Sequence, residues 1–151
     1  MPEKATIERA RRDKRQGKSA STQAGEFVRE EMHHIREGKH GARSAKQAIA
    51  IGLSKARRAG VPLKPPEKGK APAKTRRSAA RDAAAGRRAS PKRPSARRSK
   101  ASLAKLRREG HSAASHRALS RQAHSAAKRR TKSERSAAAR KAARTRAPRS
   151  H

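Results

Sequence analysis

The chain has 151 residues, of which 44 are lysine or arginine and 11 are aspartate or glutamate, so its formal net charge is +33. Leucine, isoleucine, valine and phenylalanine make up only about 8% of it, far below the roughly 20% under which high net charge predicts disorder. This composition excludes a sizeable hydrophobic core. There is no cysteine for a disulfide and no run of about 18 apolar residues for a membrane span. The chain also opens without the apolar stretch of a signal peptide, so we expect a cytoplasmic protein.

Residues 1–20 are predicted to form a charged N-terminal arm. Acidic and basic side chains alternate there, and a short helix is expected over Ala5–Gln16. Glu8 and Arg12 stand one helical turn apart, which is a weakly stabilising pair, and Gly17 is expected to end the helix.

Residues 21–61 are predicted to form a helical hairpin, the best-specified unit of the chain. Its first helix is expected over Thr22–Glu37. Ser19, Ser21 and Thr22 offer hydroxyl groups that can cap the first turn, and apolar residues recur at helical spacing after them. Gly38 suits the end of this helix.

The second helix of the hairpin is expected over Ala45–Ala59, after a hinge at Gly38–Arg43. Ser44 and Gln47 form a capping box at its start. Gly60 follows its last residue, where glycine commonly ends a helix.

The apolar stripes of the two helices predict a very small core between them. Gly52 lies in the middle of its stripe and is expected to permit close approach of the first helix. Ile51 lies off the stripe, which suggests a protein partner or self-association as a role for the hairpin. The expected core residues are Phe27, Val28, Met32, Ile35, Ile49, Leu53 and Ala56.

Beyond the hairpin the chain consists mainly of basic residues, serine, alanine and proline. Residues 62–101 are predicted to form a disordered linker rich in Pro, Lys and Arg, and residues 102–151 a basic tail with helical segments. The expected fold is therefore mostly α-helical with extensive disorder. It comprises a small helical hairpin and basic, alanine-rich tail helices, without a sizeable core or a β-sheet.

One helical segment of the tail has a cationic stripe. Arg117, Arg121, His124 and Lys128 recur at helical spacing, and Leu119 lies on the opposite side. Such a helix would present a row of positive charges to a partner.

A second tail helix is expected after a capping box formed by Thr131 and Glu134. Arg140 and Arg144 stand one turn apart on it. Like charges at this spacing oppose a helix in isolation, and bound phosphate groups would relieve that repulsion.

Cations concentrate in the C-terminal part of the chain, which points to a polyanionic partner. Residues 64–151 carry 29 basic and 4 acidic side chains, whereas residues 1–63 carry 15 and 7. The planar fork of arginine binds phosphate through two parallel hydrogen bonds. The candidate nucleic-acid-binding residues are Arg76, Arg77, Arg87, Arg88, Lys92, Arg93, Arg97, Arg98, Arg117, Arg121, Lys128, Arg129, Arg130, Arg140 and Arg144.

The near absence of aromatic residues indicates which kind of nucleic acid the chain would bind. Proteins that read single strands stack bases on aromatic side chains, and Phe27, the only one here, is expected in the core. Binding to a duplex backbone, most of all double-stranded DNA, is therefore favoured, and RNA stays an alternative. The tetrapeptide from Ser90 to Arg93 resembles the SPKK-type motif of linker-histone tails, which suits a minor groove.

The sequence gives little support for catalysis or for metal binding. Glu30 and His33 have the spacing of one ligand pair in di-iron bundles, and His34 and His40 are nearby, but the partner motifs are missing. We therefore expect neither a metal nor another cofactor. Because neither a nucleophile–base pair nor a glycine-rich phosphate loop is recognisable, we also expect no enzymatic activity.

The segment from Lys46 to Gly60, KQAIAIGLSKARRAG, resembles the hallmark of a family of small basic bacterial proteins of unknown function. The N-terminal TIERARRDKR and the Ser-Ala-Arg-rich tail extend this resemblance over most of the chain. Members of the family are often labelled DNA-binding, and the family brings no catalytic residues. The resemblance therefore implies a role in binding nucleic acid.

The sequence predicts a non-enzymatic, histone-like DNA-binding protein of the cytoplasm that associates with the bacterial nucleoid. Its cationic segments would neutralise phosphates with little sequence preference. Two alternatives stay open. One is an RNA- or ribosome-associated basic protein, and the other is a protein-interaction module in which the hairpin docks a partner while the basic arms hold it to nucleic acid.

Overall fold

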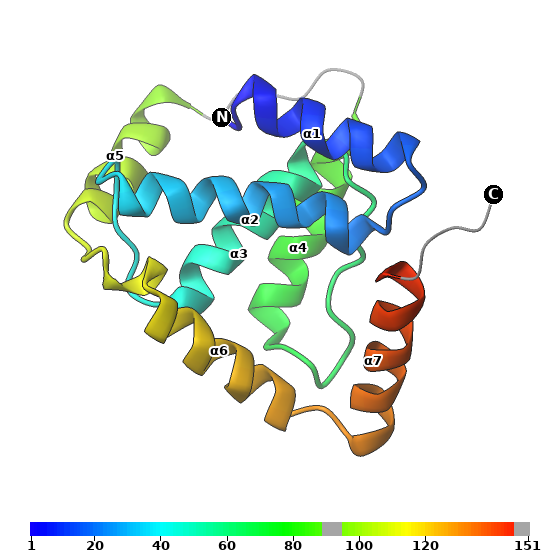
Figure 1. Ribbon diagram of the computed structural model, residues 1–151. Helices are drawn as coiled ribbons and strands as arrows, with labels where there is room; N and C mark the ends of the chain where they lie inside the picture. Colours follow the sequence, from blue (N-terminus) through cyan, green and yellow to red (C-terminus); the bar gives the residue numbers. More distant parts are fainter. Residues whose placement is uncertain (89–94, 147–151) are drawn as a thin grey trace.

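The computed structural model describes residues 1–88 and 95–146, and over these residues the chain is helical with no β-strand (Figure 1). The α-helices are α1 (Lys4–Arg15), α2 (Ala20–Arg36), α3 (Ala45–Arg58), α4 (Ala73–Gly86), α5 (Ala96–Arg107), α6 (His116–Lys128) and α7 (Lys132–Arg146), and the short 3₁₀ helix η1 (Ser112–Ala114) precedes α6. None of the helices in this described part is both long and apolar enough to cross a membrane.

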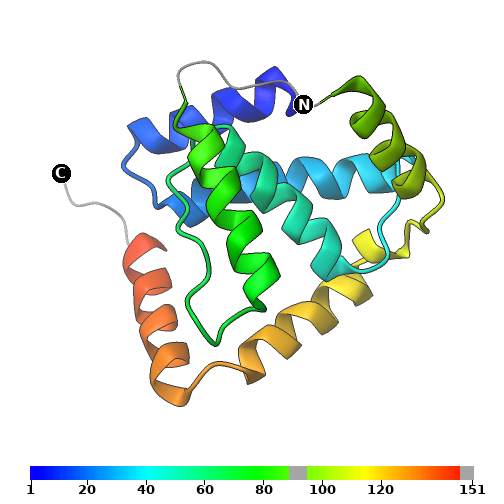
Figure 2. The ribbon, with the colours of Figure 1, turned by 180° about the vertical axis from the view of Figure 1, so that it is seen from behind.

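The helices α1 to α4 form the body of the molecule. α3 lies between α2 and α4, and α1 packs along α2 (Figures 1 and 2). In Figure 1, α6 runs along the lower edge of this body and α7 stands at its right-hand edge.

Local signals in the sequence predicted how the two helices of the hairpin end and where α3 begins, whereas α2 begins at Ala20, two residues before the expected Thr22. The Oγ of Ser19 accepts a hydrogen bond from the backbone N–H of Thr22 at the start of α2, and the Oγ of Ser44 accepts one from Gln47 at the start of α3. Gly38 and Gly60 follow the two helices with φ of 72° and 89°, a left-handed conformation that only glycine adopts at low cost.

The helices α2 and α3 approach each other closely at Gly52, as the sequence predicted. A Cβ atom at this position would lie 2.7 Å from the Cα of Val28 and 3.0 Å from its Cγ2. Since real Cβ atoms do not come this close to backbone, the absence of a side chain at Gly52 is what allows the contact.

The buried apolar residues form two clusters. Four of the seven predicted core residues are buried members of these clusters, and Val28, Ile49 and Leu53 are partly buried and packed against them. Alanine supplies most of the buried members, and the clusters together extend beyond the hairpin into α1, η1, α6 and the segment after α3. The first cluster consists of Met32, Ile35, Ala42, Ala48, Ala113 and Ala114, flanked by Val28, Ile49 and Leu119. The second consists of Ala10, Ala24, Phe27, Ala56 and Val61, flanked by Ile7, Ala20, Leu53 and Leu63.

Two expectations about the core need adjustment. The core was expected to lie between the two hairpin helices alone, whereas residues more than 50 positions away complete it, as Ala114 does beside Ile35. Ile51 is partly buried, so it is not an exposed apolar residue that would require a docked partner.

The prediction of extensive disorder is wrong, and with it the description of the chain as intrinsically disordered. α4 and α5 occupy much of residues 62–101, the segment expected to be a disordered linker. The buried carboxylate of Asp82 holds α4 against α3, because it accepts hydrogen bonds from Ser54 Oγ at 2.6 Å and from Arg58 Nε at 2.7 Å. Gly86 lets the end of α4 lie against the backbone carbonyl of Arg57. The prediction of disorder was based on the low content of large apolar residues, and that content says nothing about such polar and backbone contacts.

The connection between α3 and α4 is also fixed in place, by hydrogen bonds from Arg57 of α3. The guanidinium of Arg57 donates to the carbonyl oxygens of Leu63 at 3.3 Å and Lys64 at 3.4 Å. Burial lowers the pKa of Arg57, and the charge of Asp82 partly opposes this shift. The segment that begins at Val61 therefore follows α3 along a defined path.

We predict that Gly52→Ala destabilises the protein by about 1–3 kcal/mol, because the new methyl group would overpack the contact with Val28. The matched control is Gly25→Ala in α2, where nothing lies within 4 Å of the added atom. The control should leave stability unchanged or raise it by about 0.5–1 kcal/mol through helix propensity. Urea unfolding followed by circular dichroism measures both, and equal effects of the two substitutions would contradict the close approach.

We also predict that Asp82→Ala loosens α4, at a cost of about 1–3 kcal/mol, because Ser54 and Arg58 lose their shared acceptor. Hydrogen exchange of the α4 amides should then accelerate more than exchange in α2. Arg81→Ala, at the neighbouring exposed position of the same helix, should leave the exchange unchanged. Unaltered protection of α4 in the Asp82 variant would show that other contacts hold the helix.

Candidate nucleic-acid interface

The predicted nucleic-acid-binding residues are spread over four helices and the turns that follow them. Lys92 and Arg93, and with them the whole Ser90–Arg93 motif, lie outside the described residues. All other candidates are exposed except Arg76, which is half-buried and whose buried Nε finds no hydrogen-bond partner among the described residues. The exposed candidates are Arg77, Arg87 and Arg88 on and after α4, Arg97 and Arg98 on α5, Arg117, Arg121 and Lys128 on α6, Arg129 and Arg130 after it, and Arg140 and Arg144 on α7.

The orientation of α6 follows from the packing of its apolar side. Ser115 caps the helix by accepting a hydrogen bond from the N–H of Ala118, and Leu119 packs against the first apolar cluster. The opposite face, with Arg117, Arg121 and Lys128, is therefore turned to solvent. At 1.5 Å of rise per residue, these three cations span about 16 Å along the helix.

The start of α6 is fixed to the hairpin by backbone and arginine contacts. Arg36 Nε donates to the carbonyl oxygen of Ala114 at 2.9 Å, which ties η1 to the end of α2. In the predicted hinge, the N–H of Gly41 donates to the carbonyl of Leu106 at 2.9 Å, and that of Ala42 to Gly110 at 3.0 Å. The cationic face of α6 thus has a defined direction relative to the body of the molecule.

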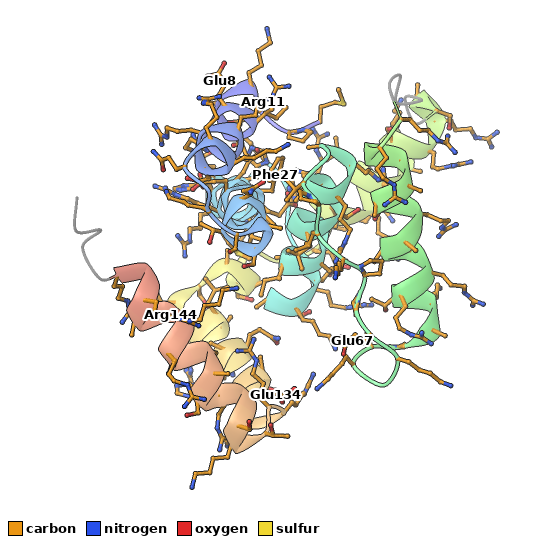
Figure 3. All side chains as sticks on the ribbon, turned by 90° about the vertical axis from the view of Figure 1, so that its right-hand side faces the viewer. Glu8, Arg11, Phe27, Glu67, Glu134 and Arg144 are labelled. Carbon is orange, nitrogen blue, oxygen red and sulfur yellow. The ribbon has the colours of Figure 1, made fainter. Side chains whose placement is uncertain are left out.

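The start of α7 is the capping box that the sequence predicted. The N–H of Glu134 donates to Thr131 Oγ1 at 3.2 Å, and the N–H of Thr131 donates to Glu134 Oε2 at 2.8 Å. Lys70 Nζ donates to the other carboxylate oxygen at 2.9 Å, which links α7 to the segment before α4. Hydrogen bonds from Lys70 and then from the Thr131 backbone lower the pKa of Glu134 to about 2. Figure 3 shows Glu134 near the start of α7 and Arg144 towards its end.

Acidic side chains neutralise few of the cations in the C-terminal part. Among the described residues, none of the candidate cations lies within ion-pairing distance of a carboxylate. The acidic residues pair elsewhere, as Glu26 does with Arg9 at 2.6 Å and Asp82 with Arg58 at 2.7 Å. The excess of positive charge that the sequence located in residues 64–151 is therefore available at the surface of α4 to α7.

A separate polar cluster is buried between α2, α3 and the hinge, and the sequence did not predict it. Sequence spacing singled out Glu30 and His33, but His33 is exposed. The structure brings together Glu31, His34 and His40 instead, with one ligand atom of each residue within 4.8 Å of the others. Glu31 and His34 have the same spacing of three residues as Glu30 and His33, so this pattern could have identified the pair.

A surface groove of about 300 Å³ between α1 and α2 reaches this polar cluster. Glu3, Arg9, Glu30, His34 and Lys39 are among its lining residues. Glu3 Oε1 lies 2.9 Å from His34 Nε2 and 3.4 Å from Lys39 Nζ, and hydrogen bonds from these two side chains lower the pKa of Glu3.

Comparisons with protein-family models, with curated proteins and with solved structures found no match. The resemblance of residues 46–60 to a family of basic bacterial proteins, and the absence of enzymatic activity, therefore stay predictions.

We predict that the Glu134 carboxyl group titrates near pH 2 and that Lys70→Gln moves its midpoint up towards 4.5. The pKa in the folded state is depressed, so the stabilising contact is present at neutral pH and is lost as the pH falls through about 2. NMR titration of the side-chain carboxyl measures both values. Lys74→Gln, which removes the charge of an exposed lysine four residues further along the chain than Lys70, is the control. An equal shift in the control would mean that overall charge, and not the contact with Lys70, sets the pKa.

Proposed function

We propose that this protein binds double-stranded DNA through its phosphates, with little preference for sequence. The observation that carries the proposal is the solvent-facing row of Arg117, Arg121 and Lys128 on α6, whose opposite side is packed on the core and which no carboxylate of the described residues approaches to ion-pairing distance. A row held in this way can meet a polyanion without unfolding the helix or breaking an ion pair.

Phosphate contacts of this kind gain free energy mainly by releasing counterions from DNA. Each neutralised phosphate makes the slope of log K against log salt steeper, that is more negative, by about 0.9 for a B-form duplex. Arg117 and Arg121 are one helical turn apart, roughly 6 Å along the axis, so neighbouring phosphates suit them. Arg140 and Arg144 repeat the spacing on α7, and the two helices offer separate rows to the backbone.

The single aromatic residue supports duplex binding over single-strand binding. Phe27 is only 1% exposed and packs in the second apolar cluster among α1, α2 and α3 (Figure 3). It is therefore unable to stack on an unpaired base, which is the usual device of single-strand readers. Duplex RNA shares the phosphate chemistry, and competition between DNA and RNA duplexes of equal length distinguishes the two.

A nucleoid-associated, histone-like role follows from the same chemistry. With a net charge of +33, one molecule neutralises many phosphates and reduces the repulsion between neighbouring duplex segments. Crosslinking in cells, followed by nuclease treatment, tests this role. Release of the protein by DNase supports it, and release by RNase alone would favour an RNA- or ribosome-associated role.

We predict that replacing Arg117, Arg121 and Lys128 together by glutamine weakens binding to unrelated DNA duplexes and reduces the salt slope by about 2.7, which is 0.9 for each of three lost phosphate contacts. Glutamine keeps helix propensity, so α6 should persist. Fluorescence anisotropy at several salt concentrations measures the slope.

The control replaces Arg11, Arg12 and Arg15 on α1 by glutamine, which removes the same charge from exposed positions outside the proposed interface. Figure 3 shows Arg11 and the acidic Glu8 close together on α1. The control should reduce the slope by much less than the α6 variant. Equal reductions would show that binding depends on net charge alone, and a strong preference for one DNA sequence would contradict the proposed phosphate readout.

A further inference from the structure

Glu31 of α2 is a fully buried carboxylate that is contacted by side-chain nitrogens but not by well-aligned donors. Its relative exposure is 0%, and within the described part of the chain neither Oε1 nor Oε2 accepts a hydrogen bond of good geometry. Lys55 Nζ of α3 approaches Oε2 to 2.6 Å, so an ion pair offsets part of the charge. Oε1 faces His40 Nε2 at 3.1 Å. A buried carboxylate oxygen in this position normally has a donor or a metal ion beside it.

The ring of His40 is oriented so that its Nε2 faces Glu31. Its Nδ1 lies 3.0 Å from the carbonyl oxygen of Gly41, which only accepts hydrogen bonds, so the proton belongs on Nδ1. In the neutral ring, Nε2 then carries a lone pair directed at the Glu31 carboxylate. Two acceptors at 3.1 Å repel each other unless a proton or a cation stands between them.

His34 completes the group from the next turn of α2. Its ring meets that of His40 edge to face, with centroids 6.1 Å apart, and Glu3 Oε1 holds its Nε2 at 2.9 Å. Its side chain is 13% exposed, so it stands between the buried pair and the surface groove.

We propose that Glu31, His34 and His40 form a binding site for a divalent metal ion that prefers imidazole ligands, such as Zn²⁺. The 3.1 Å between Nε2 and Oε1 suits neighbouring ligands of one ion, since bonds of about 2.0–2.2 Å at near-tetrahedral angles place ligand atoms roughly 3–3.5 Å apart. The widest separation in the group, up to 4.8 Å, has to shorten by about 1 Å, which requires a small shift of the His34 ring together with the exposed Glu3 that contacts its Nε2.

The surroundings of the group match what metal-binding side chains need. The Nδ1 of His40 donates to a backbone carbonyl, as in most metal-bound histidines, and the second oxygen of Glu31 is held by Lys55. The groove between α1 and α2 provides an entry path. Because Glu31 and His34 belong to α2 and His40 to the hinge, a bound ion would tie the hinge to the helix.

The test is a titration of the full chain with Co²⁺, followed by displacement with Zn²⁺. Wild-type protein should bind one equivalent of Co²⁺ with the strong visible absorption of a near-tetrahedral site, lose that absorption when Zn²⁺ is added, and show a raised melting temperature. His40→Gln and His34→Gln should each weaken binding by at least about tenfold. The titration is done at physiological salt, which screens the repulsion between the metal ion and the positively charged chain.

His33→Gln is the matched control, because His33 neighbours His34 on α2 but is exposed. It should leave Co²⁺ binding unchanged. The proposal is overturned if the wild type binds no stoichiometric ion, which would assign the His40–Glu31 contact to a protonated histidine, or if His33→Gln weakens binding as much as His34→Gln does. Circular dichroism of each variant verifies the fold, and His34→Gln, at a partly exposed position, keeps the test decisive if His40→Gln unfolds.

Discussion

At Gly52 the backbone of α3 passes so close to Val28 on α2 that a methyl group there would overlap its Cα. The rest of the structure depends on approaches of this kind, because a chain with few large apolar side chains buries surface only where backbones come near each other. Gly41 lies in the same way against the carbonyl of Glu109, and Gly86 against that of Arg57. Alanine then fills the remaining space in both apolar clusters. Small residues at the contact points thus allow this composition to form a packed helical body.

Buried carboxylates set the second constraint. Glu31, paired with Lys55, and Asp82, paired with the exposed Arg58, connect α3 to the helices on either side of it. Removing a partner of a buried carboxylate is costly, so these contacts favour one arrangement of the helices over others. These pairs also place two of the few carboxylates of the chain inside the fold. Among the described residues, Arg117, Arg121 and Lys128 on α6 are left without a carboxylate at ion-pairing distance, so the proposed DNA interface and the ordering of the helical body are linked.

Much of the local structure could be predicted from the sequence. That α4 and α5 are ordered helices could not. Ser44 and Thr131 cap the helices they were expected to cap, and Gly38 follows α2 as expected. The composition nevertheless predicted disorder over residues 62–101, where α4 is in fact held by Asp82. In the polar cluster, Glu31 and His34 were within reach of a spacing rule. The sequence grouped His34 and His40 only as neighbours of Glu30 and His33, so it did not identify Glu31 as their partner. Of the candidate cations, Arg76 was taken for a surface residue although it is half-buried.

The sequence by itself determined approximately where α1, α2 and α3 begin and end, where α7 begins, how much positive charge the chain carries, and that a single phenylalanine is present without tyrosine or tryptophan. Caps, glycine stops and helical periodicity act within about four residues, so they can be recognised without a fold. Only the tertiary structure decided which carboxylates are neutralised, which face of α6 is turned to solvent, and that His40 faces Glu31. Those contacts depend on how closely α2, α3 and α4 approach, and that distance is set by small residues far apart in the chain.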